Sequence, residues 1–330
     1  MFENYFNKQN LKIIESGDEE KISKLIKKRG NNFSEEAQLA LLKKGICIDL
    51  FIKHSSNLCA EALKLIVERG VTKDICYVIQ HNDIPKELEK LIIARGIDYE
   101  QEALVRKDLQ CQSSVSEIIA GKNHKAIIAL LEELSSFFST LRISEEDKDK
   151  IIFNDNPEEI KTYFKRSFLP SEKAILHLID VGNVEAVIAA FSINCQRYNP
   201  FSDKIIKMVL DKGDEQMIFA MLRQREKLLL HLKQVHKSLD WLEKAILARG
   251  NKDEISMLAR IYPISDQTIY EILERDNKQE IKAIIDNERL DDKFVYNLIE
   301  NRKYDLLENY AKYASDKYLY MFSCLMKKHS

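Results

Sequence analysis

Residues 59–96 read CAEALKLIVERGVTKDICYVIQHNDIPKELEKLIIARG and contain the pattern that decides the fold. Two apolar runs in this stretch end in Arg-Gly, at Arg69-Gly70 and at Arg95-Gly96. Glycine can take the left-handed conformation that ends a helix, and the cation before it faces the negative end of the helix dipole. Each Arg-Gly pair therefore predicts the end of a helix, and its recurrence predicts a repeat.

The same ending recurs along the chain, because all nine glycines follow an apolar run and fit a helix-stop role. About eleven residues before many of these stops stands Ser, Pro or Asp with acidic residues after it, a pattern that caps a first helical turn. The spacing also recurs without glycine, where Ser144 precedes Asp155, Ser265 precedes Asp276 and Asp291 precedes Arg302. Each repeat is thus predicted to begin with a helix of about three turns.

Helix starts counted in this way fall at residues 34, 59, 85, 110, 144, 171, 202, 239, 265, 291 and 315, which gives a unit of 25 or 26 residues. An apolar pair such as Ile66/Val67 lies three and four residues before each stop and predicts the buried stripe of the first helix. Apolar residues five, eight and nine places after the stop, such as Ile75, Val78 and Ile79, predict one face of a second helix.

A pair of short helices buries one face internally and leaves another uncovered, so stacking on neighbouring pairs must supply the rest of the core. We therefore expect an all-α fold, a right-handed α-α superhelical solenoid of about ten two-helix repeats, two of them longer than the rest. A single body over 1–330 is expected, with a cap and first helices in 1–33, repeats in 34–143, repeats in 144–290 that include an extended unit at 202–238, and last repeats and a cap in 291–330.

The unit resembles HEAT-like and other α-solenoid repeats across almost the whole chain, and residues 182–185 are similar to the start of the second helix of an ankyrin unit. At about 25 residues the unit is shorter than ankyrin, tetratricopeptide or HEAT repeats, and it lacks the Thr-Pro-Leu-His and Trp-Leu-Gly motifs. The resemblance is therefore one of architecture. It implies a protein-binding scaffold or adaptor whose second helices line a concave surface.

Composition and motifs give no sign of catalysis. Lys and Arg number 51 against 53 Asp and Glu, so no overall attraction to nucleic acid or an anionic membrane is expected. The six cysteines form no CxxC pair, and no phosphate-binding glycine loop is present. We expect no catalytic residue, no metal, no cofactor and no small-molecule substrate, and a protein partner in the cytoplasm. The low-Gly, Lys- and Ile-rich composition favours a bacterial or viral protein, with a secreted bacterial effector inside a host cell as the finer hypothesis.

Two repeats are longer than the unit, and insertions in solenoids often lie on the binding face. The first, residues 132–142, contains Leu134, Phe137, Phe138 and Leu141, which either extend a second helix against the next repeat or form a partner groove. The second, residues 223–237, is named here the basic segment. Its candidate partner-binding residues are Arg223, Arg225, Lys227, His231, Lys233, His236 and Lys237. The alternative is a solvated amphipathic helix, since leucines are interleaved with the cations.

A second function class remains open for the sequence alone. Some HEAT-like solenoids excise damaged DNA bases with an acid and aromatic residues on a basic face, and Asp240 and Trp241 are the candidates here. A core position in a first helix is the other interpretation of Trp241, and both histidines of the basic segment are expected at the surface. Tyrosines gather from Tyr296 onward, where they either cover a terminal repeat or form an aromatic partner surface.

Overall fold

The computed structural model describes residues 2–55, 57–133, 142–193, 198–234, 239–286 and 292–313. The all-α prediction is confirmed, because these ranges contain 23 α-helices and no strand, and the helices pack against their sequential neighbours. The chain divides into two compact units, Met1–Phe168 and Leu169–Ser330, and each is described by itself. The expectation of one continuous solenoid over 1–330 stays a prediction.

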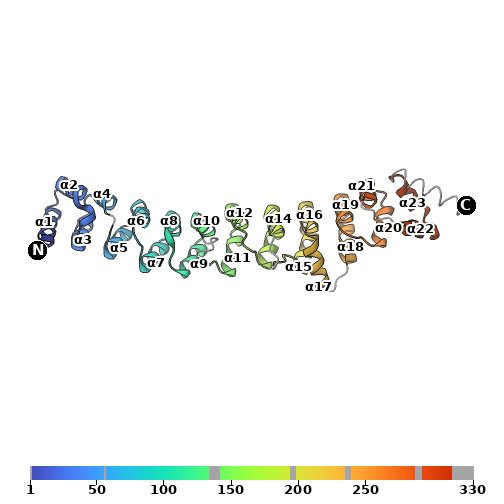
Figure 1. The fold of residues 1–330 in the computed structure, drawn as a ribbon, viewed down its shortest axis with the longest axis horizontal. Helices are drawn as coiled ribbons and strands as arrows, with labels where there is room; N and C mark the ends of the chain where they lie inside the picture. Colours follow the sequence, from blue (N-terminus) through green and yellow to red (C-terminus); the bar gives the residue numbers. More distant parts are fainter. Residues whose placement is uncertain are drawn as a thin grey trace. The chain divides into compact units, whose positions relative to one another are not determined.

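In the first unit, two kinds of helix alternate along the chain (Figure 1). The first helices of the pairs are α1 (Phe2–Ser16), α3 (Glu35–Lys44), α5 (Ala60–Arg69), α7 (Lys86–Ala94), α9 (Gln112–Ala120) and α11 (Glu145–Phe153). The second helices are α2 (Glu19–Arg29), α4 (Ile48–His54), α6 (Thr72–His81), α8 (Asp98–Asp108), α10 (His124–Glu133) and α12 (Pro157–Lys165), and a short 3-10 turn η1 (Gly30–Asn32) follows α2. First helices pack on first helices and second helices on second helices, which makes two layers.

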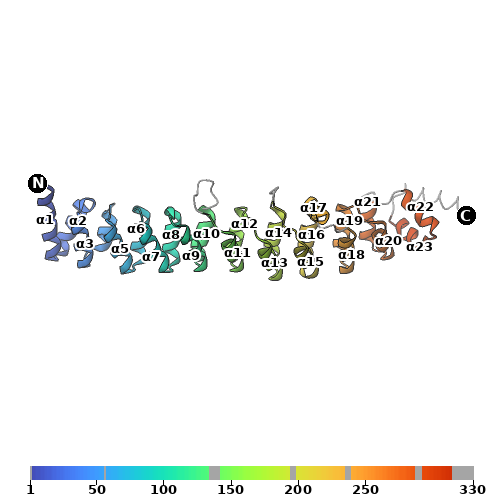
Figure 2. The same cartoon turned by 90° about the horizontal axis from the view of Figure 1, so that it is seen from below.

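The second unit repeats this arrangement up to its last pair, whose second helix packs on two first helices. Figure 2 shows its helices from another side. Its first helices are α13 (Glu172–Asp180), α15 (Asp203–Lys212), α18 (Leu239–Arg249), α20 (Asp266–Glu274) and α22 (Asp292–Glu300). Its second helices are α14 (Val184–Ser192), α16 (Glu215–Arg223), α19 (Lys252–Ile261), α21 (Lys278–Asp286) and α23 (Tyr304–Ala311). One further helix, α17 (Arg225–Gln234), interrupts the alternation between α16 and α18.

The predicted helix starts agree with the structure at nearly every described position. The residues directly before the first helices are Ser34, Cys59, Pro85, Ser144, Ser171, Ser202 and Ser265, as expected, and α18 begins at Leu239. Cys111 stands before α9, one residue later than predicted. The starts at 291 and 315 lie outside the described residues. The five serines accept a hydrogen bond from a backbone N–H of the first turn, which is the capping that the sequence indicates.

The core of each unit is the apolar pattern of the sequence. All nine predicted pairs of the first helices are buried, among them Ile66/Val67 and Leu178/Ile179. The second helices bury the predicted stripe too, with Phe164 and Ile285 half-buried at its edge. Second helices make the most extensive contacts, α8 with α10 and α19 with α21. Small buried residues such as Ala129, Ala259 and Ala283 favour such contacts, because the distance between packed helices depends on side-chain size.

Helix ends follow the predicted register, but glycine does not always take the left-handed position. Six glycines have φ between 67° and 77°, and Asp155, Asp276 and Arg302 have positive φ at the equivalent places. The expectation is wrong for Gly30, Gly121 and Gly213. A Cβ on Gly30 would lie 2.7 Å from the carbonyl oxygen of His54, and one on Gly213 would overlap a carbonyl of the preceding turn, so close approach explains these two.

After Gly121 the left-handed residue is Lys122, with φ 55°. A side chain in this conformation is strained, so Lys122→Gly is expected to raise the free energy of unfolding by about 0.5–1 kcal/mol. Urea unfolding measures the change. Lys122→Ala keeps the Cβ strain and is the matched control. A glycine variant no more stable than the alanine variant would contradict the assignment.

Candidate interaction site

The basic segment forms an additional helix rather than an extended loop. Helix α17 packs on α16. Leu228 and Leu232, four residues apart, are buried, whereas Leu230 is 52% exposed. The amphipathic helix that the leucine spacing predicts is therefore confirmed over residues 225–234.

His231 is buried, at 8% exposure, so the expectation of a surface histidine is wrong. Its Nε2 lies 3.1 Å from Oδ1 of Asp203, the first residue of α15. The imidazole shares the face of α17 that carries Leu228, because residues three apart on a helix are neighbours. His231 thus links α17 to a first helix, and its side chain is taken up in that contact.

Lys227, four residues before His231 on α17, also holds this helix in place. Its Nζ donates a hydrogen bond to the carbonyl oxygen of Ile193 at 2.5 Å, and its own carbonyl accepts one from the side chain of Asn199 at 3.1 Å. Two of the seven predicted contact residues therefore have structural partners. His236 and Lys237 lie outside the described residues, and Lys233 is exposed.

Two of the exposed cations of the basic segment, Arg223 and Arg225, lie at the junction of α16 and α17. They line a hollow of about 500 Å3 together with Ser192, Gln224, Glu226 and Lys227. Among the residues that the structure describes, neither guanidinium group has a hydrogen bond or an ion pair. We name this place the α16–α17 corner. Within the described residues, this corner and the exposed Lys233 are what remains of the predicted contact surface once Lys227 and His231 are set aside.

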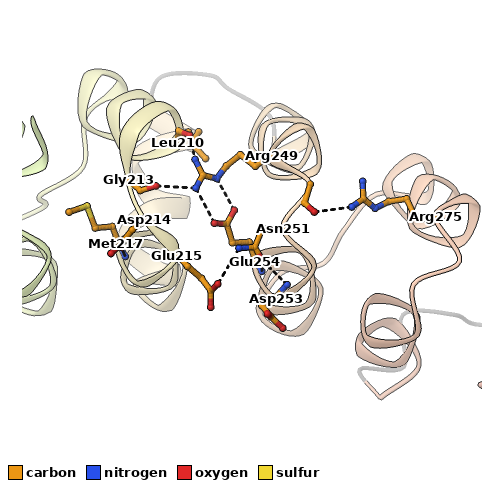
Figure 3. Close-up of polar contacts among 11 residues, drawn as sticks. Leu210, Gly213, Asp214, Glu215, Met217, Arg249, Asn251, Asp253, Glu254 and Arg275 are labelled. Atoms are coloured by element: carbon orange, nitrogen blue, oxygen red, sulfur yellow. Dashed lines mark hydrogen bonds and ion pairs between the residues drawn. The ribbon is translucent and has the colours of Figure 1, made fainter. Parts of the chain in front are cut away.

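A polar cluster that the sequence analysis missed joins α15, α18 and α19 (Figure 3). Arg249, the last residue of α18, holds the fully buried Glu254 with two hydrogen bonds, of 2.7 and 3.1 Å. Its Nη1 donates to the carbonyl oxygen of Leu210, and its Nη2, which also binds Glu254, donates to that of Gly213, at the end of α15. One side chain thus neutralises a buried acid and satisfies the free carbonyls of the preceding repeat.

The same link recurs in other repeats, and it corrects the interpretation of the Arg-Gly stops. Arg95 ion-pairs with the buried Glu100 at 2.8 Å and donates to the carbonyl oxygens of Val67 and Gly70. Arg275 ion-pairs with Glu280 and donates to the carbonyl oxygen of Gly250. Lys44 donates to the carbonyl oxygen of Glu15. These cations bind carbonyl oxygens at the end of the preceding first helix, as well as lying at the end of their own helix. They therefore join consecutive repeats. Hydrogen bonding to Glu254 raises the pKa of Arg249, and Glu100 does the same for Arg95.

A second set of buried polar groups caps the next first helix. The carboxylate of Glu89 accepts hydrogen bonds from the backbone N–H groups of Gln110 and Cys111, at 2.9 and 3.1 Å. Glu243 accepts from the backbone and the hydroxyl of Ser265. Free N–H groups at a helix start require acceptors, and an acid also favours the positive end of the dipole. The sequence signal was an acid within the apolar stripe, four residues after the predicted starts at 85 and 239.

In one repeat Asn154 stands at the position of the arginine, and a histidine of the preceding second helix pairs with the buried acid. Glu159 on α12 is fully buried, and its partners are Nδ1 of His124 and the side chain of Asn154. Burial raises the pKa of Glu159, and the hydrogen bonds from His124 and Asn154 oppose that rise. His124 is about half exposed, so this link between α10 and α12 is open to solvent on one side.

The described part of the chain offers little that resembles a reaction centre. No group of three His, Cys, Asp or Glu residues within it could hold a metal ion. Cys59 lines a hollow of about 370 Å3 with His81 and Asn82, but no hydrogen bond between described atoms joins its thiol to the imidazole. Asp240 is exposed and Trp241 is half-buried on α18, so Trp241 is not the core residue of the alternative interpretation.

The structure describes only part of the other two predicted aromatic surfaces. Helix α10 ends at Glu133, and the four apolar residues of the first insertion lie outside the described residues. Of the late tyrosines, Tyr310 is buried and Tyr304 is 44% exposed, which fits a covering role for one and surface exposure for the other. Tyr318, Tyr320 and the side chain of Tyr296 are outside the described set. No described helix has the length and apolarity needed to cross a bilayer.

Comparison with protein-family models, with curated proteins and with solved structures found no match to this chain.

Proposed function

We propose that this protein is a non-catalytic scaffold or adaptor that binds an acidic segment of a partner protein at the α16–α17 corner. The observation that carries the proposal is the pair Arg223 and Arg225, both exposed and, among the described residues, both without a hydrogen bond or ion pair, where an extra helix interrupts the repeat. Helix α16 belongs to the layer of second helices, which the sequence predicts to line the concave surface. Partner binding takes place in the cytoplasm of the producing cell or, for a secreted effector, of a host cell.

The chemistry of the corner favours a carboxylate-bearing partner. Arginine holds carboxylates through two parallel hydrogen bonds, as Arg249 and Glu254 do within this chain. An acidic segment of a partner protein would therefore satisfy the two guanidinium groups of the corner.

Arg223→Glu combined with Arg225→Glu is expected to abolish partner capture from lysates of the producing cell and of a candidate host, with at least about a tenfold loss of the enriched protein. Lys204→Glu with Lys207→Glu makes the same change in charge on α15 of the same unit and serves as control. Lys227 and His231 stay unchanged because they hold α17. Circular dichroism melts check that both variants fold.

The outcome separates this proposal from the alternative function. Capture of one protein by the wild type and the control, weakened by added salt and lost in the arginine variant, supports the adaptor. Equal capture by all three proteins would refute the α16–α17 corner as the contact. Salt-sensitive recovery of nucleic acid alone would support a nucleic-acid-binding solenoid instead, and Asp240→Asn would then test base excision.

A further inference from the structure

Helices α10 and α12 are consecutive second helices of the first unit and pack side by side (Figure 1). Their contact contains the acid Glu159, whose side chain has 0% exposure. In three of the other described repeats an arginine five residues earlier holds the equivalent buried acid, as Arg95 holds Glu100. Here that position is Asn154, and the ionisable partner is His124 at the start of α10. The contact of His124, Asn154 and Glu159 is named the histidine joint.

Three described groups face the carboxylate of Glu159 from the surrounding helices, namely His124 on α10, Asn154 at the end of α11 and Asp98 on α8. Asn154 is neutral. Asp98 is an acid, and its oxygens accept hydrogen bonds from backbone N–H groups in the first turn of α10, at 3.1 and 3.3 Å. Within this set, His124 is therefore the group that can carry a positive charge.

Other charges near the joint are exposed or turned to other partners. The Nζ atom of Lys125 lies 3.6 Å from the ring centroid of Tyr99. The charged residues of α11 lie in its first six residues, whereas Asn154 follows its last one. Glu117, the one charged residue of α9, is exposed, as are the remaining charged residues of α12. The charge of Glu159 is thus compensated from His124.

A histidine gives the joint a property that the arginine links lack. Arginine stays charged at physiological pH, whereas histidine loses its proton between about pH 5 and about pH 8. A charged imidazole neutralises the carboxylate of Glu159. A neutral imidazole still donates one hydrogen bond, but it leaves the charge of a buried acid without compensation. His124 is 51% exposed, so protons reach it from solvent while the repeat stays folded.

The buried acid gives the direction of the pH effect. Burial raises the pKa of Glu159, and this outweighs the hydrogen bonds from His124 and Asn154 and the charge of His124, which lower it, while Asp98 adds to the rise. Because the folded state holds this proton more strongly than the unfolded state does, the joint is most stable in acid. Its contribution is lost as the pH rises through the folded-state pKa.

We propose that the histidine joint is a pH-sensitive contact that holds α12 against α10 in acid and releases it as the pH rises. Release leaves the two helices folded but lets the repeat of α11 and α12 open more often. The contact lies within the first unit and does not depend on the α16–α17 corner.

Hydrogen exchange of the full chain, read by mass spectrometry of its peptides and corrected for the effect of pH on intrinsic exchange, measures the opening of α12. Between about pH 5.5 and about pH 8, the protection factors of α12 are expected to fall by about tenfold or more. Peptides of α8 are the internal comparison, because Arg95 holds Glu100 over this whole range. Their protection is expected to stay constant.

Two variants separate the charge of the joint from its packing. His124→Asn keeps a donor near the place of Nδ1 but never carries a charge, so α12 is expected to show low protection at both pH values. Glu159→Gln removes the buried charge and is expected to abolish the pH response while α12 stays protected. The matched control is His54→Asn, which replaces an exposed histidine at the end of α4 and should behave as the wild type.

Equal protection of α12 at both pH values in the wild type would overturn the proposal. So would a parallel fall in α8, which would indicate general loosening of the unit, or a pH response that persists in both His124→Asn and Glu159→Gln. The comparison of α12 with α8 in the wild type decides the outcome even where a variant fails to fold.

Discussion

Leu178→Asp is expected to remove cooperative unfolding of the second unit, or to lower its free energy of unfolding by more than about 4 kcal/mol. Leu178 has 0% exposure on α13, within the apolar pair that each first helix contributes. A carboxylate there would be buried without a partner, and it would also leave part of the leucine volume unfilled. Urea unfolding followed by circular dichroism measures the loss.

Val181→Asp is the control for this change, because Val181 follows the same helix and is 49% exposed. This variant is expected to lower the free energy of unfolding by less than about 1 kcal/mol, because an acid is unfavourable at the C-terminal end of a helix. A melt of Leu178→Asp that matches the wild type would contradict the stacked-repeat core, whatever the control shows.

Arg249→Met is expected to lower the free energy of unfolding by about 3–5 kcal/mol, because it leaves the carboxylate of Glu254 buried without a compensating charge. The variant also frees the carbonyl oxygens of Leu210 and Gly213 at the end of α15. Its effect should therefore reach the preceding repeat. Hydrogen exchange should show faster opening of the last turn of α15 as well as of α18 and α19.

The combination Arg249→Met with Glu254→Met separates the ion pair from the helix link. Removal of both charges is expected to recover much of the stability, because apolar replacements of a buried pair are often tolerated. The faster exchange at the end of α15 should persist in the double variant, since its carbonyls still lack a donor. A double variant as unstable as Arg249→Met alone would show that the buried charge is not the main cost.

The repeat could be predicted from the sequence because its signals are local. Helix caps, stops and an apolar stripe each depend on residues within a dozen positions, and they recur often enough to confirm one another. Even the stops without glycine, such as Asp155 and Asp276, take the conformation that the spacing indicates. The predicted role of a glycine was wrong where a residue distant in sequence determines the need for glycine. Gly30 is such a case, because the carbonyl group of His54 leaves no room for a Cβ there.

The polar links between repeats could not be recognised in the same way. The spacing from Arg95 to Glu100 recurs from Arg249 to Glu254 and from Arg275 to Glu280, so the pairing was visible as a pattern. The carbonyl groups that these arginines reach lie 25 to 39 residues earlier, and only stacking brings them close. The local dipole was therefore the sole partner that sequence could suggest.

The candidate site was predicted at the level of the segment and not of the residue. Net charge cannot distinguish a cation that binds its own chain from one that is free. Lys227 and His231 count toward the basic segment by composition, yet both hold α17 through Ile193 and Asp203. Burial and pairing in three dimensions reduce the seven candidates to a smaller set, centred on Arg223 and Arg225.

The most direct test of the adaptor proposal is site-specific photo-crosslinking from within the α16–α17 corner. A benzophenone amino acid at Gln224, which lines the hollow, is compared with one at Gln216, an exposed position at the other end of α16. The account predicts a covalent adduct with one partner protein from Gln224, absent from Gln216 and lost when Arg223 and Arg225 are both changed to Glu. Equal adducts from both positions, or none from Gln224 under conditions where the partner is captured, would contradict it.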